Sequence, residues 1–211
     1  MGRELLTRTI EFIFDFASPN AYLAMKALPP ILERTGAALK ISPALLGGIF
    51  KATGNSAPMV QFAGVPAKLA YERLEMERFI AAHRLTAFRF NPHFPVNSPL
   101  LMRAAMVADA DGRLNGYVEV VLRAMWELGL KMDDPEIVAP FLSDNGFDGP
   151  AMVARAGEQV AKDALAAATG AAVARGAFGV PTFFVGKDMF FGKERLGQVE
   201  ALFGLAPPAI F

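Results

Sequence analysis

The side chains that could do chemistry in this sequence include no thiol and only two imidazoles. Cysteine is absent from the 211 residues, which excludes a disulfide framework, a cysteine nucleophile and a thiolate metal site. The two histidines, His83 and His93, are too few for a multi-histidine metal centre, so no metal site is expected. His93 lies in a proline-containing loop and could act as an acid–base group, although packing or exposure is the commoner role. His83 is expected to act as a charge partner at a helix C-terminus.

One hydroxyl stands where a helix start would make it useful. Ser18 and Pro19 follow an apolar stretch, and Ser followed by Pro is a typical beginning of an α-helix. The first N–H groups of a helix have no partner within it and carry about half a positive charge. Ser18 is therefore a plain helix cap or a hydroxyl donor to an anion, and the two roles are compatible.

The elements that must position this serine begin with a predicted β-α-β unit. Thr9–Phe16 alternates its side chains with the period of a β-strand. A helix is predicted from Ser18 to about Gly36, and a second strand over Leu39–Leu46, with Pro43 weakening its centre. Such a unit is expected to have parallel strands and a right-handed crossover.

The middle of the sequence is predicted to be helical throughout, from about Pro66 to Gly176. Hydrophobic residues make up 53% of the chain, which is enough for a large buried core. The 21 basic and 21 acidic residues balance, which argues against a nucleic-acid partner. No apolar run reaches the roughly 18–20 residues of a membrane helix, and the first residues do not form a signal peptide. A cytoplasmic location without membrane attachment is therefore expected.

The end of the sequence returns to strands. Thr182–Val185 and Met189–Phe191 flank a predicted three-residue hairpin turn, Gly186-Lys187-Asp188. A last helix is predicted after Gly192, ending at Ala206-Pro207-Pro208. The order βαβ, helical block, ββα is the layout of an α/β thioredoxin-like fold with a large all-helical insertion. Residues 1–58 and 177–211 would form the thioredoxin-like domain, and residues 59–176 the helical insertion domain.

A short segment before the hairpin is the strongest single marker of that layout. Gly179-Val180-Pro181-Thr182 stands where thioredoxin-like folds have a cis-proline that faces the start of the first helix. A cis X–Pro bond costs only about 0.5–1 kcal/mol over trans, so proline is the residue that permits it. Such a bond would turn the backbone N–H and C=O of Val180 toward the site, where a peptide ligand can pair with them. An ordinary trans proline at the start of an edge strand is the alternative.

Five segments together resemble the bacterial 2-hydroxychromene-2-carboxylate isomerases, which are similar to kappa-class glutathione transferases and DsbA-type oxidoreductases. They are FDFASPNAYLA (Phe14–Ala24), KATGN (Lys51–Asn55), FPVNS (Phe94–Ser98), FGVPTFFV (Phe178–Val185) and FFGKERL (Phe190–Leu196). In the oxidoreductases the first helix opens with Cys-x-x-Cys, and here those positions read Ser18-Pro19-Asn20-Ala21. Thiol–disulfide exchange by this chain is therefore excluded, and the resemblance implies that glutathione brings the thiol as a cofactor.

The resemblance implies a glutathione site built from three segments. Ser18 would donate its hydroxyl to the thiolate, and the backbone of Val180, before Pro181, would bind the cysteinyl part. The γ-glutamyl end would lie at the start of the last helix, where family members have Gly-x-Asp-Arg and where helix N–H groups suit a carboxylate. Here the segment reads Gly192-Lys193-Glu194-Arg195, and Glu194 is one methylene longer than the usual aspartate.

Lys51 and Asn55 follow the second strand, in a region that lines the site in the family. Lys51 is a candidate partner for the carboxylate of an aromatic acid substrate. Asn55 is a candidate contact to glutathione or substrate. A surface lysine and a turn asparagine are the plainer alternative for the two residues.

The activity that the resemblance implies is a glutathione-dependent isomerase. It would interconvert 2-hydroxychromene-2-carboxylate and trans-o-hydroxybenzylidenepyruvate, or act on a related unsaturated aromatic acid. A thiolate adds to the conjugated enone, the C–C bond rotates and the thiolate leaves, so that glutathione is not consumed. The alternatives are a kappa-like glutathione transferase or peroxidase that consumes glutathione, and a non-catalytic, cysteine-free thioredoxin-like binding module. Related proteins are usually homodimers, so a homodimer is expected.

Overall fold

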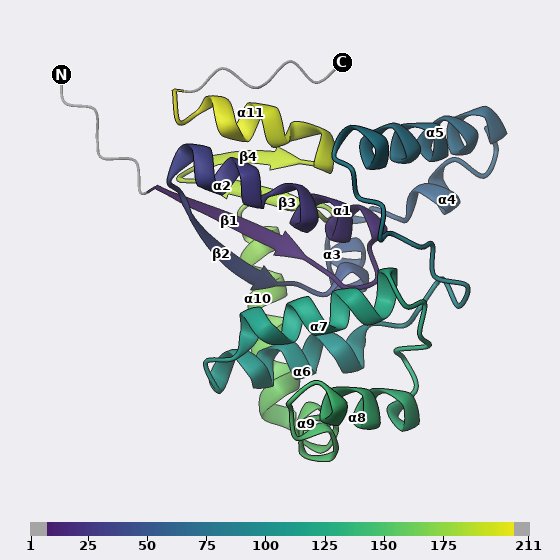
Figure 1. The fold of residues 1–211 in the computed structure, drawn as a ribbon, viewed down its shortest axis with the longest axis vertical. Helices are drawn as coiled ribbons and strands as arrows, with labels where there is room; N and C mark the ends of the chain where they lie inside the picture. Colours follow the sequence, from purple (N-terminus) through teal and green to yellow (C-terminus); the bar gives the residue numbers. More distant parts are fainter. Residues whose placement is uncertain (1–7, 205–211) are drawn as a thin grey trace.

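A four-stranded mixed sheet forms the centre of the computed structural model, which describes residues 8–204. The strand order is β2-β1-β3-β4, with β1 (Thr9–Phe14) parallel to β2 (Ala38–Pro43). β3 (Thr182–Val185) is antiparallel to β1, and β4 (Asp188–Phe191) is antiparallel to β3 (Figure 1). The predicted thioredoxin-like fold, with its parallel pair and terminal hairpin, is confirmed.

Helices precede, separate and follow these strands. In chain order they are α1 (Pro19–Ala27), α2 (Pro29–Thr35), α3 (Leu46–Thr53), α4 (Pro58–Gln61), α5 (Pro66–Ala82), α6 (Pro99–Ala110), α7 (Leu114–Trp126), α8 (Pro135–Asp144), α9 (Gly149–Ala156), α10 (Gln159–Ala174), the 3-10 turn η1 (Lys193–Arg195) and α11 (Leu196–Ala201). The helical middle of the chain is therefore confirmed. Within residues 8–204, no helix has the length and apolar character needed to cross a bilayer. The predicted helix end at Ala206-Pro207-Pro208 lies outside the described residues.

The single helix predicted after Ser18 is two helices in the structure. α1 ends at Ala27, and α2 begins at Pro29, because a proline has no N–H with which to continue the helical ladder. Gly36 ends α2 in the left-handed conformation, with φ of 63°, as its place after the helix predicts.

The strand ends also differ from the prediction. β1 stops at Phe14, because the backbone turns at Asp15 and its side chain caps the following loop. The predicted three-residue hairpin turn is wrong: Val185 pairs with Asp188, which leaves only Gly186 and Lys187 in the turn. Gly186 has φ of 60° and Lys187 does not have positive φ, as a two-residue type II′ turn with glycine at its first central position requires.

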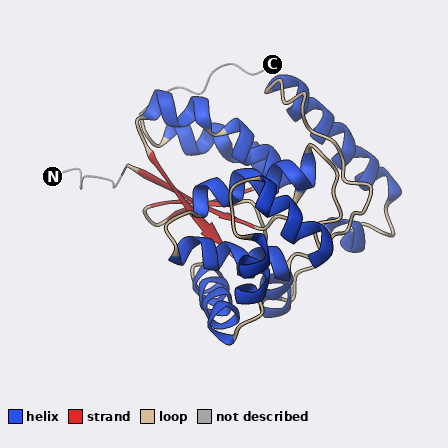
Figure 2. Cartoon of the chain, turned by 60° about the horizontal axis from the view of Figure 1, so that its bottom comes forward, coloured by secondary structure: helices blue, strands red, loops and turns tan. Residues whose placement is uncertain are grey.

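Helices cover both faces of the sheet, as Figure 2 shows. Because successive side chains of a strand point to opposite faces of the sheet, the buried apolar residues form two clusters. Phe12 and Phe183 belong to a large cluster that also contains apolar residues of α1, α2, α6 and α7. Ile13 and Phe184 belong to a smaller cluster with Ile49 of α3 and residues of α10.

The helical insertion is attached to the sheet through its buried residues. The indole N–H of Trp126, in α7, donates to the carbonyl oxygen of Phe16 at 2.9 Å. The ring of Phe16 packs edge-on against Tyr117, with ring centroids 5.8 Å apart. The core is therefore continuous across the boundary between residues 59–176 and the rest of the chain. The division into two domains stays a prediction, and part of its first domain lies outside the described residues.

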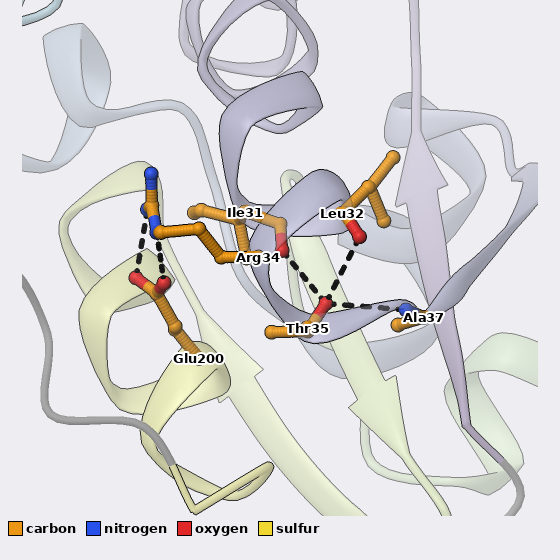
Figure 3. A network of polar contacts seen from close by, with 6 residues as sticks. All are labelled: Ile31, Leu32, Arg34, Thr35, Ala37 and Glu200. Atoms are coloured by element: carbon orange, nitrogen blue, oxygen red, sulfur yellow. Dashed lines mark hydrogen bonds and ion pairs between the residues drawn. The ribbon is translucent and has the colours of Figure 1, made fainter.

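A second set of contacts fixes α11 against α2 (Figure 3). The guanidinium of Arg34 binds the buried carboxylate of Glu200 through two hydrogen bonds, of 2.5 and 3.0 Å. The hydroxyl of Thr35 donates to the carbonyl oxygen of Ile31 and accepts from the N–H of Ala37. Because α11 follows the Gly192–Arg195 segment directly, the Arg34–Glu200 pair also limits where that segment can lie.

We expect Trp126→Phe to lower the free energy of unfolding by about 1–3 kcal/mol, because the buried carbonyl of Phe16 loses its donor. Urea unfolding followed by circular dichroism measures the change. Val160→Ala, at a side chain on α10 that is 70% exposed, is the control and should stay within about 0.5 kcal/mol of wild type. Equal stability of the two variants would show that α7 does not depend on this bond.

Candidate active site

Three of the predicted segments meet at one end of the sheet. Ile13 of β1 lies opposite Thr182 of β3 in an antiparallel register, so the residues after β1 and before β3 are neighbours. The Val180–Pro181 bond is cis, as predicted. The N–H of Gly192 donates to the carbonyl oxygen of Pro181 at 2.9 Å, and η1 contacts α1. Ser18, Val180–Pro181 and Gly192–Arg195 therefore surround one region.

Ser18 is the N-cap of α1, and its side chain is buried. Its hydroxyl oxygen accepts a hydrogen bond from the N–H of Ala21 at 3.2 Å. Accepting that bond leaves the hydroxyl hydrogen free to donate to another group. The cap role is thus confirmed, and the geometry is compatible with the donor role.

Asn20, in the first turn of α1, is a site residue that sequence reasoning missed. Its side-chain oxygen is buried and accepts no hydrogen bond from any of the described residues. A buried polar atom without a partner is costly, and at a candidate site it indicates a place for a ligand donor. The signal in the sequence was an amide inside the Ser18–Ala21 stretch that replaces Cys-x-x-Cys.

Asp15 is a second residue that sequence reasoning missed. Its carboxylate is fully buried and accepts three hydrogen bonds. One comes from the N–H of Ala17 at 2.9 Å, one from the N–H of Leu46 at 2.7 Å and one from the hydroxyl of Ser98 at 3.0 Å. Burial raises the pKa of Asp15, against the effect of these three donors. The carboxylate joins the start of α1 to the starts of α3 and α6.

The segment around the cis-proline has backbone groups without hydrogen-bond partners and two partly exposed aromatic rings. Within the described residues, neither the N–H nor the C=O of Val180 has a hydrogen-bond partner. Phe178 and Phe191 pack with ring centroids 4.4 Å apart and are 38% and 40% exposed. A Cβ at position 179 would lie 2.8 Å from the ring of Phe191, so a larger residue there would displace that ring. Sequence reasoning had not assigned the two phenylalanines to a pocket.

The two residues predicted to contact the substrate, Lys51 and Asn55, have different surroundings from each other. Lys51 is exposed in the last turn of α3 and makes no ion pair within residues 8–204. Asn55 is half-buried and uses its amide on the protein itself. Its NH2 group donates to the carbonyl oxygen of Phe178 at 2.7 Å, and its oxygen accepts from the N–H of Ser56 and from Gln61. Asn55 therefore fixes the loop two residues before Val180.

The Gly192–Arg195 segment is a 3-10 turn rather than the start of a regular helix. α11 follows it and has only six residues, so helix N–H groups contribute less here than the sequence suggested. The charged side chains are therefore the main groups of this segment that could bind a ligand. Lys193 is buried and forms an ion pair with Glu194, which is half exposed, and Arg195 is exposed.

Within the described residues, neither histidine side chain forms a hydrogen bond with these segments. The ring of His83 packs on Phe79, with ring centroids 4.2 Å apart, and burial lowers the pKa of His83. His83 lies at the C-terminal end of α5, as predicted, and the lowered pKa disfavours the charged form that its predicted charge role needs. His93 is exposed, and its backbone N–H donates to the side chain of Asn91. In the described part of the chain, no three acidic or histidine side chains are grouped as a metal site would require.

The fold and the cysteine-free first turn together define a thioredoxin-like protein without disulfide chemistry. A model of the DSBA-like thioredoxin domain matches residues 9–204, and the chain belongs to that family. It is 29% identical over 206 residues to a 2-hydroxychromene-2-carboxylate isomerase of Pseudomonas sp. (strain C18), which covers 97% of this chain and 94% of that protein. It is 27% identical to glutathione S-transferase kappa 1 of Rattus norvegicus, over 93% of this chain and 91% of that protein. A solved structure of a 2-hydroxychromene-2-carboxylate isomerase superposes with a TM-score of 0.80 at 28% identity, covering 93% of this chain and 94% of that one.

The raised pKa of Asp15 gives a pH dependence with a defined sign. A carboxyl whose pKa is higher in the folded than in the unfolded chain stabilises the fold below about pH 4, and this contribution is lost as the pH rises through the folded pKa. We expect Asp15→Asn to be less stable than wild type, by about 1–3 kcal/mol at neutral pH, because an NH2 group replaces one acceptor oxygen. The difference in unfolding free energy between wild type and Asp15→Asn should be largest near pH 4 and should become smaller at higher pH.

Glu11 is the control for this measurement, because its pKa is shifted in the opposite direction to the pKa of Asp15. Burial raises its pKa, but hydrogen bonds from Arg175, Lys40 and Ser42 outweigh burial and lower the pKa to about 2. The gap between wild type and Glu11→Gln should therefore shrink as the pH falls below about 4. Parallel pH profiles of the two variants would contradict the assigned shift of Asp15.

Proposed function

We propose that this chain is a glutathione-dependent isomerase of 2-hydroxychromene-2-carboxylate or a related unsaturated aromatic acid. The observation that carries the proposal is the Ser18 hydroxyl, which caps α1 beside Val180–Pro181 in a chain without cysteine. The similarity to isomerases along nearly the whole chain supports the reaction class. The similarity to a kappa-class glutathione transferase supports glutathione as the thiol.

The residues present fit glutathione on three counts. The hydroxyl of Ser18 has a hydrogen to donate to a sulfur. The backbone N–H and C=O of Val180 lack partners within the described residues and can pair with the cysteinyl backbone. Lys193 and Glu194 supply opposite charges for the charged γ-glutamyl end.

Bound glutathione would supply the thiolate that adds to the substrate double bond and leaves after the bond has rotated. Ser18 and the N-terminus of α1 hold the negative charge on the sulfur and so favour the ionised thiol near pH 7. Lys51 attracts the carboxylate of the substrate. Phe178 and Phe191 offer an aromatic surface on which a planar ring can stack. Asn55 fixes the loop that carries Phe178.

A transferase or peroxidase is the second candidate, because the rat kappa-class relative is named as a glutathione transferase. Both enzymes would use the same thiolate site, so the difference lies in the fate of glutathione. An isomerase leaves the glutathione concentration unchanged after many turnovers, whereas a transferase or peroxidase consumes glutathione in proportion to product. A cytoplasmic location stays a prediction.

We expect wild-type protein to bind glutathione in calorimetric titration and Ser18→Ala to lower kcat/KM for isomerisation by about 10²-fold or more, since one donor to the reacting anion is lost. Ser143→Ala, which changes an exposed hydroxyl on α8, is the matched control and should keep wild-type rates. No heat of binding at millimolar glutathione would reject both enzymatic proposals and favour the binding module. Full activity of Ser18→Ala would remove that residue from its role.

We also propose that the protein is a homodimer in which the α4–α5 region contributes to the interface. α5 has 17 residues and none of them is buried. Val60, Tyr71 and Leu74 are 64%, 56% and 41% exposed, so this region presents an apolar surface without a partner within the described chain. Such surfaces commonly mark protein interfaces, and a two-fold pair would bury the same patch on both copies.

Sedimentation velocity tests the dimer. We expect a mass of two chains for wild type and a shift toward one chain for the double variant Tyr71→Glu/Leu74→Glu, because buried unpaired carboxylates are costly. Val160→Glu, at a position on α10 that is 70% exposed, is the matched control and should keep the wild-type mass. A dimer that survives both changes places the interface elsewhere, and a single-chain mass for wild type rejects the dimer.

A further inference from the structure

The amide of Asn20 differs from the other asparagine amides that lie inside the fold. Asn55, Asn91 and Asn145 are partly or fully buried, and each donates its NH2 group to a backbone carbonyl oxygen. Asn20 is half-buried, but its side chain makes no hydrogen bond within the described residues. Its oxygen is buried, whereas its nitrogen is accessible. The amide therefore has one unused acceptor and one unused donor group.

Asn20 lies beside Ser18 at the start of α1 but points in a different direction. It is the second residue of α1, and Ser18 is the N-cap. Side chains two residues apart on a helix do not face each other, so the hydroxyl and the amide would meet different atoms of one ligand. Both stand at the helix N-terminus, whose partial positive charge favours negative charge on a bound group.

The proposed isomerisation needs a donor at an atom other than the sulfur. The thiolate sulfur forms a bond to the carbon beside the aromatic ring, and the electrons of the C=C bond move to the carbonyl oxygen, which becomes an enolate. After rotation about the new single bond the electrons return, the C=C bond forms again and the thiolate leaves. Several carbon atoms separate the sulfur from the enolate oxygen, so the donor to the sulfur is not placed to stabilise the oxygen.

We propose that Asn20 is a catalytic residue whose NH2 group donates a hydrogen bond to the enolate oxygen of the substrate. The inference rests on the proposed glutathione-dependent isomerase, because that reaction produces the enolate. A donor held where negative charge develops binds the enolate more strongly than the carbonyl, so it raises kcat rather than only lowering KM. Asn20 donates a hydrogen bond and transfers no proton.

The amide oxygen fits the other form of the same substrate group. In 2-hydroxychromene-2-carboxylate this group is a hydroxyl, and ring opening leaves it as a carbonyl while its proton goes to the ring oxygen. The last side-chain torsion of asparagine is broad and roughly two-fold, so the amide can turn and present either end. The oxygen then accepts from the hydroxyl form, and the NH2 group donates to the carbonyl and enolate forms.

The unpaired oxygen also gives the sign of a stability change. A buried polar atom without a partner destabilises the fold, so an apolar side chain of similar size should replace Asn20 without loss of stability. A residue kept for function at a cost in stability loses activity but not stability when it is replaced. We therefore expect Asn20→Leu to keep or raise the Tm of the free protein.

Steady-state kinetics with trans-o-hydroxybenzylidenepyruvate at saturating glutathione test the proposal, together with calorimetry of glutathione binding. Asn20→Leu should lower kcat by about 10²- to 10³-fold, as for loss of an oxyanion donor, with little change in KM or in the affinity for glutathione. Asn20→Asp should lose at least as much kcat, because a carboxylate cannot donate and repels the enolate. An acidic residue suits the first turn of a helix, so Asn20→Asp decides if Asn20→Leu does not fold.

Asn115→Leu is the matched control, because Asn115 is the exposed second residue of another helix, α7. It should keep the wild-type kcat, KM and glutathione affinity. A wild-type kcat in either Asn20 variant, or a loss confined to KM, would overturn the proposal. Weaker glutathione binding together with a lower Tm in the Asn20 variants would show a structural role and would also overturn it. A wild-type protein that binds no glutathione or isomerises no substrate would instead reject the proposed function on which the inference rests.

Discussion

The position of the candidate site depends on one buried carboxylate. Asp15 accepts hydrogen bonds from the turn before α1, from the first residue of α3 and from the serine that precedes α6. A carboxylate has enough lone pairs for these bonds, and no neutral side chain of its size accepts three donors on two oxygens. Burial opposes its charge and raises its pKa, so the group is held by its donors rather than by solvent. Three segments far apart in the sequence are thereby fixed around the start of α1.

Local patterns were sufficient for the features that depend on neighbouring residues. Alternation predicted β1, Ser18-Pro19 predicted the helix start, and Gly36 predicted the end of the second helix. The cis bond before Pro181 was predictable because only proline makes that geometry inexpensive, and because the order of elements placed it opposite the first helix. The exact residues at which adjacent elements begin and end were harder to predict. Pro29 divides one predicted helix, and the pairing of Val185 with Asp188 shortens the hairpin turn.

The rest of the site could not be predicted because it depends on contacts between distant segments. Asp15 read as a polar residue of a strand, and nothing near it in sequence indicates that Leu46 and Ser98 bind its carboxylate. The ligand contact expected of Asn55 stays a prediction, and nothing in the local sequence indicated that its amide binds the carbonyl of Phe178, 123 residues away. Lys193 belonged to a charged run of the kind that is usually solvated, but in the fold it is buried, with Nζ 5.3 Å from the ring centroid of Phe79 on α5. Burial and partner choice are properties of the whole fold.

The candidate site has two ends. The missing cysteine marks one end, and the buried side chain of Lys193 marks the other. At one end a hydroxyl stands where related oxidoreductases have a thiol, so in the proposed function the sulfur comes with glutathione. At the other end the buried ammonium of Lys193 pairs with Glu194, and the proposed function assigns this pair to the charged γ-glutamyl end. Between them lies the unpaired backbone of Val180. Glutathione, the ligand of the proposed function, is a short peptide with a thiol near its middle and an α-amino acid group at one end, so it would meet all three features.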